Sequence, residues 1–442
     1  MSNEGLQSHP QVTREILALA VPAFFALVAE PMFLLADSAI VGHLGTPQLA
    51  ALGIAGSVMG TLVSLCIFLA YGTTGSVARR VGAGDLTAAL NQGIDGLWLA
   101  VAVGIPATLF GLLFTPTIVD WFGPTREVAQ QAMAYLSVAV LGSVPLLLML
   151  AATGVLRGLQ DTRTPMWVAI GGNIANIVFN LVFVYGFGWG IAGSAWGTVL
   201  AQVGSAIALV AVVVRGARRH GATVRPHLGG IRAAASTGIP LIVRTATLRA
   251  ALLLMTYGAA RYGDAPLAAM QLTMTIWLAL AFALDAIAIA AQAIIGRYLG
   301  AGDPIRVRTL TDTMIRWGVC SGVVTGLILA AITPWVGRAF TTDPAVLDLV
   351  VPVLIVAALA QPVAGVVFVL DGVLIGAGDQ RFLARAMALA AAAMLVAIAP
   401  VLPLGLGIGW AWAAFAVLMV VRAATLWARY RGDAWVRLGA AA

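Results

Sequence analysis

The sequence predicts an all-α integral membrane protein of twelve transmembrane helices, built as two parallel six-helix repeats. Three observations predict this fold. Of the 442 residues, 61% are hydrophobic and only 10% are charged, against roughly 25% charged residues in a soluble globular domain. The chain divides into twelve apolar segments long enough to cross a bilayer. Its second half also repeats its first at a constant offset of 218 residues.

The low charge content excludes several classes of protein. A soluble chain of this length needs a charged surface that this sequence cannot supply. A soluble enzyme, a nucleic-acid-binding protein and a disordered chain are therefore ruled out. The formal net charge of +7 has a simpler explanation than nucleic acid, because basic residues gather on the cytoplasmic loops of membrane proteins.

The predicted spans lie between clusters of charged and turn residues. Each is long enough to cross the roughly 30 Å hydrocarbon core as a helix, and no alternation typical of a β-barrel is present. The first six are expected at 15–41, 49–79, 88–114, 127–152, 164–187 and 191–214, and the second six at 233–260, 266–297, 309–332, 345–371, 382–403 and 406–428.

The internal repeat divides the chain into two lobes. Identical residues recur 218 positions later throughout, as in Pro22 and Pro240, Gly45 and Gly263, the tetrapeptides at 82–85 and 300–303, and Asp161 and Asp379. Six helices is an even number, so both repeats enter the membrane in the same direction, which is one of the known transporter plans. We therefore expect an N-terminal lobe at 1–214, a linker at 215–232 and a C-terminal lobe at 233–442.

The arginines orient the chain. With twelve spans, both termini and the linker share one side, and 18 of the 25 basic residues fall there. The opposite loops hold only Arg126, Arg261 and Arg338. This asymmetry predicts that both termini are cytoplasmic. The arginine-rich linker, which has few apolar residues to bury, is expected to be a cytoplasmic tether.

The first span carries two acids. Inserting a charged group into a bilayer costs at least ~2.5–3.5 kcal/mol of free energy, so each such group requires a structural or functional explanation. Asp37 lies late in the span and Glu30 seven residues earlier, which places both on nearly one helix face. Pro22 and Pro31 can kink this helix because proline lacks the backbone donor. A kinked helix with a carboxylate can change shape when that carboxylate is neutralised. The alternative is a structural carboxylate paired to a neighbouring helix.

The fifth and sixth spans carry a row of neutral polar groups. Asn173, Asn176 and Asn180 are spaced three and four apart, on one helix face. Thr198 and Gln202 follow four apart on the next span. With Asp37 these groups could surround a proton or a small cation, although amides and hydroxyls also serve as simple contacts between helices.

The second half holds a different set of charges within its spans. Arg244 and Arg249 lie in the seventh span, Asp285 in the eighth and Asp371 at the end of the tenth. Two arginines in a membrane need counter-charges, and Asp285 is the expected one. Such a pair is either structural or functional, since breaking it would leave a buried charge. The duplicate of Asp37 is Met255, so only the first repeat keeps this acid.

The sequence contains no pattern for chemistry on a covalent bond. It lacks a P-loop motif, its four histidines lie in loops or tails, and it has no acidic cluster of the kind that holds Mg²⁺. The repeated Gly-Ala-Gly-Asp at 82–85 and 300–303 stands at helix ends beside arginines and predicts turns. We expect no enzyme activity, no metal and no cofactor.

Several segments resemble multidrug and toxic compound extrusion (MATE) transporters of the DinF-type branch. The resemblance begins at Glu30-Pro31 and runs through Asp37 to Ile40-Val41-Gly42-His43-Leu44-Gly45. It continues at 81–85, 154–161, 173–193, 285–303 and 370–379, and touches essentially all twelve spans. It implies two lobes in a V with a central cavity. The implied activity is export of organic cations or amphiphilic compounds by alternating access, against inward H⁺ or Na⁺.

The resemblance also implies which residues bind the coupling ion. The family's cation site in the N-terminal lobe corresponds to Asp37, Asn176, Asn180 and Thr198. The family commonly has Asp where this chain has Asn180, and the loss of one carboxylate favours H⁺ over Na⁺. Asp285 and Asp371 match acids of the C-terminal lobe.

The expected setting is the bacterial inner membrane, where a monomer would act on small molecules within the lipid bilayer. The rival is a flippase for lipids or lipid-linked oligosaccharides from the same superfamily. Its cavity would be richer in arginine, for which only Arg244 and Arg249 are candidates.

Overall fold

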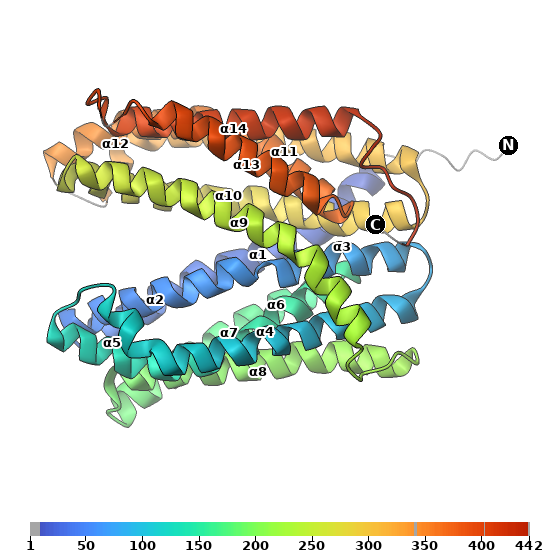
Figure 1. Cartoon of the computed structure of the whole chain (residues 1–442), viewed down its shortest axis with the longest axis horizontal. Helices are drawn as coiled ribbons and strands as arrows, with labels where there is room; N and C mark the ends of the chain where they lie inside the picture. The colour runs from blue at the N-terminus through green and yellow to red at the C-terminus, as the bar shows by residue number, and fades with distance from the viewer. Residues whose placement is uncertain (1–8, 340–342, 402, 441–442) are drawn as a thin grey trace. The chain divides into compact units, whose positions relative to one another are not determined.

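The computed structural model describes residues 9–339, 343–401 and 403–440, and over these ranges its regular structure is entirely helical. The first repeat contains α1 (His9–Gly42), α2 (Thr46–Cys66), α3 (Phe68–Gly82), α4 (Leu86–Asp120), α5 (Arg126–Ala139), η1 (Val140–Gly142), α6 (Ser143–Gly158), α7 (Arg163–Asn180), the π-helix η2 (Leu181–Gly186) and α8 (Gly190–Arg219). The second contains α9 (Leu228–Arg261), α10 (Asp264–Gly300), α11 (Pro304–Val336), η3 (Gly337–Ala339), α12 (Pro344–Gly376), α13 (Gln380–Ile398) and α14 (Gly407–Arg431) (Figure 1).

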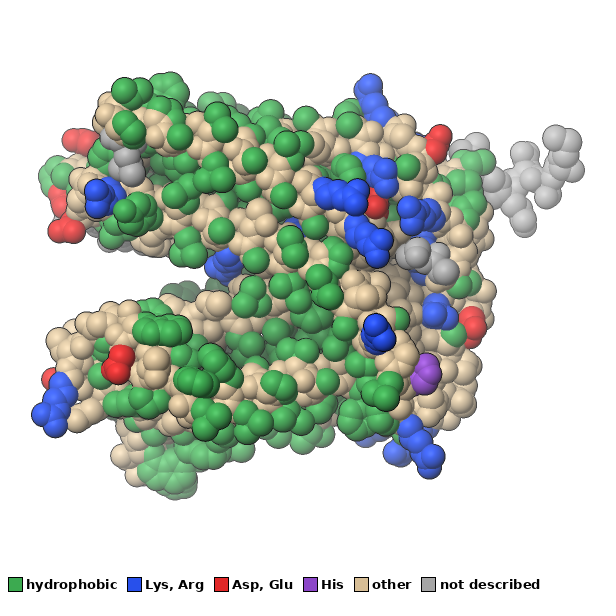
Figure 2. All heavy atoms as spheres, viewed as in Figure 1, with side chains coloured by type: hydrophobic (Ala, Val, Ile, Leu, Met, Phe, Trp, Pro, Cys, Tyr) green, Lys and Arg blue, Asp and Glu red, His purple; other side chains and the backbone are tan. Residues whose placement is uncertain are grey.

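Twelve membrane-length helices are present among the described residues, which confirms the predicted number. Three spans consist of more than one helical piece. They are Thr46–Gly82 with α2 and α3, Arg126–Gly158 with α5, η1 and α6, and Arg163–Gly186 with α7 and η2. Several helices run beyond their predicted ends; the fourth span continues from 152 to Gly158. In Figure 2, hydrophobic side chains cover the middle of the visible face, and most charged side chains lie toward its two ends.

The chain packs as two compact units whose boundaries differ from the lobes expected from the sequence. The N-terminal unit is 21–238, and the C-terminal unit is 1–20 together with 239–442. The first helix of each repeat therefore begins in one unit and continues in the other. Both changes occur just before a proline within the helix, Pro22 in α1 and Pro240 in α9. Because proline removes one helical hydrogen bond, each helix has a built-in bending point there.

The repeated Gly-Ala-Gly-Asp segments form helix-ending turns, as predicted. Gly84 and Gly302 have φ angles of 80° and 74°, a region that glycine enters without strain. The following aspartates then cap the next helix. Asp85 Oδ1 accepts from the backbone N–H of Ala88 at 2.8 Å, and Asp303 makes the matching bond at 2.9 Å. Both carboxylates cap a helix, so the repeated motif has a structural role and does not need a bound phosphate to explain it.

Small residues allow the same close helix contact in both units. A Cβ placed on Gly154 of α6 would collide with the backbone of Ala70 in α3, and one placed on Gly372 of α12 would collide with the backbone of Ala288 in α10. All four positions obey the 218-residue offset. Glycine at such crossings lets helix backbones approach closely, which is how membrane helices gain packing energy.

The connection between the repeats is bound along one face of α4. Thr87, Asn91 and Trp98 are four and seven residues apart, so their side chains line one side of the helix. All three form hydrogen bonds with the backbone of the connecting loop at 220–227. These are Thr87 Oγ1 to His220 O at 3.0 Å, Thr223 N to Asn91 Oδ1 at 2.8 Å and Trp98 Nε1 to Val224 O at 3.0 Å.

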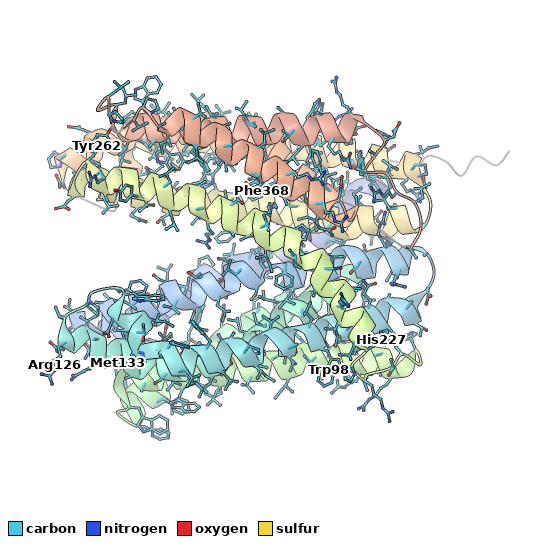
Figure 3. The ribbon with its side chains drawn as sticks, viewed as in Figure 1. Trp98, Arg126, Met133, His227, Tyr262 and Phe368 are labelled. Carbon is cyan, nitrogen blue, oxygen red and sulfur yellow. The ribbon has the colours of Figure 1, made fainter. Side chains whose placement is uncertain are left out.

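This loop is therefore not the free tether that the sequence suggested. Residues 215–219 complete α8 and residues 228–232 begin α9, so only 220–227 remain as loop. Figure 3 shows His227 at the start of α9 and Trp98 on α4. The interpretation as a tether failed because it counted apolar side chains, whereas the loop is held by side chains of α4 that bind its backbone.

Replacing Trp98 by Phe should loosen this loop. The ring remains but the indole N–H to Val224 O is lost, and one such hydrogen bond contributes about 0.5–1.5 kcal/mol. We expect trypsin to cleave after Arg219, at the start of this loop, about two- to tenfold faster in the folded protein. Trp167→Phe on α7, where the side chain is exposed, is the control and should leave the rate unchanged. Equal rates in both variants would contradict the docked arrangement.

Candidate functional site

Asp37 is the centre of a buried polar cluster in the N-terminal unit. Its relative exposure is 2%. Its Oδ1 accepts hydrogen bonds from Ser194 Oγ at 2.6 Å and from Asn180 Nδ2 at 2.8 Å, and its Oδ2 accepts a longer one from Tyr135 at 3.4 Å. These donors come from α8, α7 and α5. One carboxylate on α1 is thus held by neutral donors from three other helices.

The amide row continues the cluster away from the carboxylate. Asn180 Nδ2 also donates to Asn176 Oδ1 at 3.2 Å, and Asn176 Nδ2 donates to Thr198 Oγ1 at 2.9 Å. All three residues are buried. The structure therefore brings Asp37, Asn176, Asn180 and Thr198 into one connected network, although the sequence places them on three separate spans.

Three other polar residues of the predicted set lie outside this network. Asn173 donates to the backbone oxygen of Ala29 on α1 at 2.6 Å. Gln202 is partly buried and faces Gly142, where a Cβ would overlap its Oε1. Glu30 is exposed. Among the three asparagines on one face of α7, only Asn176 and Asn180 therefore join Asp37, because Asn173 lies two turns earlier on the helix and reaches the α1 backbone instead.

Two hydrogen bonds fix α1 on either side of Asp37. Asn173 binds the oxygen of Ala29, before the kink residue Pro31, and Tyr185 Oη donates to the oxygen of Ile40 at 2.8 Å. Tyr185 belongs to the π-helix at 181–186, a form often found at functional sites. The segment of α1 that carries Asp37 is thus held at both ends by one neighbouring helix and its extension.

Sequence reasoning missed Ser194, Tyr135 and Tyr185. The spacing could have revealed Ser194, because it lies four residues before Thr198 and so shares its helix face. No sequence pattern indicated the two tyrosines, whose hydroxyl groups reach α1 only through the tertiary arrangement.

The matching positions of the second repeat are apolar. Met255 and Met394 lie 218 residues after Asp37 and Asn176. In the last helix the offset becomes 217, because Gly188 and Gly190 match Gly405 and Gly407, all with positive φ. The counterparts of Ser194 and Thr198 are then Ala411 and Phe415. Met255, Met394, Ala411 and Phe415 all belong to the hydrophobic core of the C-terminal unit. The polar cluster is therefore a feature of one unit and no requirement of the fold.

The C-terminal unit has its own charged cluster. Arg244 Nη2 of α9 donates to Asp371 Oδ2 of α12 at 2.6 Å, and Arg422 of α14 binds the same oxygen. The sequence suggested Asp285 as the counter-charge of the arginines, and the structure adds Asp371 as an ion-pair partner of Arg244. Asp285 is partly buried on α10 and Arg249 is exposed on α9. The correct pairing depends on which helices cross, and sequence spacing does not contain that information.

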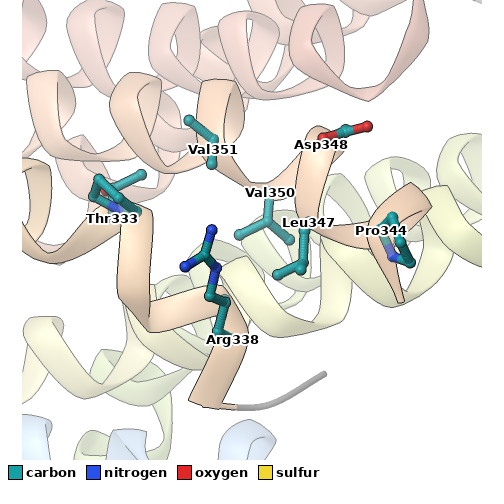
Figure 4. Close-up of a pocket in the computed structure, with 9 residues that line it drawn as sticks. Thr333, Arg338, Pro344, Leu347, Asp348, Val350 and Val351 are labelled. Atoms are coloured by element: carbon teal, nitrogen blue, oxygen red, sulfur yellow. The ribbon is translucent and has the colours of Figure 1, made fainter. Parts of the chain in front are cut away.

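The described residues contain no group of three or more His, Cys, Asp or Glu side chains that could hold a metal ion. A pocket of about 210 Å³ lies where α11 meets α12, lined by Thr333, Arg338, Leu347 and Asp348 among others (Figure 4). None of the residues predicted from the sequence lines it.

A family model described as MatE matches residues 22–182 and 240–401. The chain belongs to the MatE family. Members of this family are transporters for multidrug and toxic compound efflux, so this MATE protein is a multi-pass membrane transporter of small molecules and not an enzyme. The two matched ranges correspond to the two repeats and include Asp37, Asn176 and Asn180.

Named relatives and solved structures agree with this assignment. The chain is 30% identical to Protein DETOXIFICATION 44, chloroplastic, from Arabidopsis thaliana, over 85% of this chain and 74% of the relative. It is 29% identical to DNA damage-inducible protein F from Escherichia coli, with coverages of 81% and 79%. A MATE crystal structure in the bent conformation matches its fold with a TM-score of 0.88 at 21% identity, covering 96% of each chain.

Replacing Gly197 by Ala should disturb the polar cluster through packing alone. A Cβ at Gly197 would overlap Asn180 Oδ1 and lie 3.0 Å from the Asn180 backbone nitrogen. We expect the free energy of unfolding to fall by about 1–3 kcal/mol and drug efflux to fall with it. Gly204→Ala on the same helix, where nothing lies within 4 Å of the new methyl group, is the matched control. Identical melting temperatures for both variants would count against this packing.

Proposed function

We propose that this MATE protein is a secondary antiporter that exports organic cations or amphiphilic compounds in exchange for H⁺. The observation that carries the proposal is the Asp37 cluster, where one buried carboxylate is surrounded by neutral hydrogen-bonding groups. A group that alternates between charged and neutral in such a place can couple proton movement to a change in shape. Its burial makes the cost of the charge depend on the surrounding donors.

The side chain of Asn180 can respond to a change in the charge on Asp37, because an amide has both a hydrogen-bond donor and an acceptor. Its Nδ2 donates to the carboxylate, while its Oδ1 is buried without a hydrogen-bond partner. A protonated Asp37 needs an acceptor for its new O–H. Rotation of the amide by half a turn would exchange Nδ2 for Oδ1 and supply that acceptor. The same rotation would break the bond from Asn180 Nδ2 to Asn176 Oδ1, which passes the change along α7.

Movement of α1 would link this exchange to export. Asp37 lies between Pro31 and the point where Tyr185 holds Ile40, and Pro22 marks the place where α1 enters the N-terminal unit. When protonation weakens the bonds that hold Asp37, α1 can bend at Pro22 or Pro31. Bending would alter the volume available to substrate in this unit and release it.

The hydrogen-bonding pattern favours H⁺ over Na⁺ as the coupling ion. Asp37 is satisfied by N–H and O–H donors, whereas a dehydrated Na⁺ requires several oxygen ligands turned toward it. The site also has a single carboxylate, since Asn180 replaces the acid common in the family. Binding of a proton requires only the Asp37 carboxylate as acceptor and a rotation of the Asn180 amide, and this chain contains both groups.

The arginine asymmetry gives the proposed orientation. Both termini and the loop at 220–227 would lie in the cytoplasm of a bacterial cell, with the protein acting as a monomer in the inner membrane. Outside pH is lower in a respiring bacterium, so protons would enter as the substrate leaves.

Asp37→Asn should fold but lose coupled export. The amide keeps the shape of the side chain but cannot exchange a proton. The measurement uses proteoliposomes whose outside is more acidic than their inside, and only the protein molecules inserted in the export orientation are counted. We expect drug transport by this variant to fall to the level of empty vesicles. Asp120→Asn, an exposed acid at the end of α4, makes the same chemical change and should leave transport intact. Wild-type transport by Asp37→Asn at equal protein level would remove Asp37 from the mechanism.

Asn180→Asp should shift the ion requirement toward Na⁺. A second carboxylate beside Asp37 adds like-charge repulsion that a bound cation relieves. With pH clamped, a Na⁺ gradient alone should drive transport in the variant and none in the unmodified protein. Gln202→Glu adds a carboxylate that is not bonded to Asp37 and should behave as the unmodified protein. Transport by the unmodified chain on a Na⁺ gradient alone would refute H⁺ coupling.

A further inference from the structure

Three hydrogen bonds show how α1 lies along α7 and its extension η2 in the N-terminal unit. They are Asn173 Nδ2 to Ala29 O at 2.6 Å, Asn180 Nδ2 to Asp37 Oδ1 at 2.8 Å and Tyr185 Oη to Ile40 O at 2.8 Å. The bonded residues are 144, 143 and 145 positions apart, so the two helices run in the same direction in a nearly constant register. Asp37 therefore lies between two points at which the backbone of α1 is bound.

The π-helix brings Tyr185 onto the helix face that contacts α1. In an α-helix, residues three and four positions apart share a face, and Tyr185 follows Asn180 by five. The segment η2 is a π-helix, and its backbone bond from Phe187 N to Val182 O at 2.9 Å joins residues five positions apart. This wider turn places a residue above the one five positions before it. The π-helix therefore keeps Tyr185 in register with Ile40.

Tyr185 binds one of the carbonyl groups at the end of α1. The last four carbonyls of a helix have no partner within it, and α1 ends at Gly42. Beyond this end, Leu44 N donates to Val41 O at 3.0 Å, while Tyr185 Oη donates to Ile40 O. Backbone groups in a bilayer need partners inside the protein, so this bond completes the end of α1 and joins it to η2.

The last turn of α1 is held by two kinds of contact. Val41 is buried in the hydrophobic core of the N-terminal unit, but hydrophobic contact has no preferred direction. The bond from Tyr185 to Ile40 is directional, and so it fixes the rotation of this turn. Asp37 precedes Ile40 by three residues, less than one helical turn. The direction in which the carboxylate points therefore depends on the Tyr185 bond.

The second repeat builds the same region without a π-helix. Its helix α13 ends at Ile398, and the residues described between there and α14 form turns. The position of Asp37 is taken by Met255 in that repeat, and Met255 is buried in an apolar core. A π-helix that only served the fold would be expected in both units. Its occurrence in the unit that contains the acid links it to the Asp37 site.

We infer that Tyr185 is a positioning residue for proton exchange at Asp37, because its bond to Ile40 holds the last turn of α1 where the carboxylate meets its donors. Asn180 and Tyr185 belong to one continuous helical segment, so the carboxylate and the backbone of α1 are bound to the same support. Movement of α1 must break the Tyr185 bond as well as the bonds to Asp37. This inference rests on the proposed H⁺ antiport and deepens it.

Tyr185→Phe tests this role because it removes one hydroxyl group from a side chain that is half exposed and leaves no cavity. Loss of one hydrogen bond should shift the equilibrium between held and moved α1 about two- to tenfold. Protonation favours the moved form under the proposed function, so the variant should need less acid to move. Half-maximal transport in proteoliposomes should therefore occur at an outside pH higher by up to about one unit.

Tyr257→Phe is the matched control, because it removes the same atom from an exposed tyrosine of α9 and should keep the pH profile of the unmodified protein. Other titratable groups along α1 and on α5, namely Glu30, His43 and Tyr135, remain in both variants. Both proteins should melt within a few degrees of the unmodified chain. A lower melting temperature of Tyr185→Phe with an unchanged pH profile would indicate a purely structural role and overturn the inference.

The movement of α1 can be measured in the purified full-length protein in detergent, without any ion gradient. Spin labels are attached at Leu35→Cys on α1 and Leu113→Cys on α4, whose side chains are exposed, after Cys66→Ser and Cys320→Ser remove the native thiols. The distance between the labels is then measured by pulsed electron paramagnetic resonance at neutral pH.

Tyr185→Phe should increase the population of a second label distance about two- to tenfold, and Asp37→Asn should favour the same distance. The control Tyr257→Phe should keep the distribution of the unmodified protein. If Tyr185→Phe moves α1 while the unmodified protein shows no proton-driven transport, the positioning of α1 by Tyr185 stands and the proposed antiport fails. If transport is proton-driven but Tyr185→Phe changes neither the distances nor the pH profile, the role of Tyr185 alone is wrong.

Discussion

A charged side chain within the membrane needs partners inside the protein, and the arrangement of this transporter depends on that constraint. Asp37 is satisfied by donors from α5, α7 and α8, so the helices of the N-terminal unit meet at one carboxylate. Asp371 is satisfied by arginines from α9 and α14, which join the helices of the C-terminal unit in the same way. The two clusters differ in composition. The first has a carboxylate among neutral groups, and the second has a carboxylate between two arginines.

The duplication shows which features belong to the fold and which to function. Gly154 and Gly372 make the same close backbone contact in both units, and Asp85 and Asp303 cap the same helix. These positions solve problems of packing and helix ends that both repeats share. Around Asp37 the two repeats differ in polarity. The core that replaces the Asp37 cluster in the second repeat contains Met255 and Phe415, which can pack but cannot exchange a proton.

The long first helix of each repeat links the two units mechanically. α1 and α9 each change from one unit to the other just before Pro22 and Pro240. α1 then carries Asp37, and α9 carries Arg244. A bend at either proline therefore acts directly on a helix that carries one of the two charged clusters. The hydrogen bonds from α4 to the loop at 220–227 hold the chain shortly before α9 begins.

The sequence by itself indicated the helical class, the number of spans, the duplication and the grouping of Asn176, Asn180 and Thr198 with Asp37. Hydropathy, a fixed offset and a family resemblance can all be recognised without knowing which helices cross. The sequence did not determine the unit boundaries at 20 and 238, the bound loop, or the partner of Arg244. The sequence favoured Asp285 as a counter-charge, and only the crossing of α9, α12 and α14 brought Asp371 to Arg244 and Arg422. Tyr135 and Tyr185 likewise carry no sequence signal. Such contacts join residues about a hundred or more positions apart, and they are decided by helix packing, whose geometry single-helix patterns do not contain.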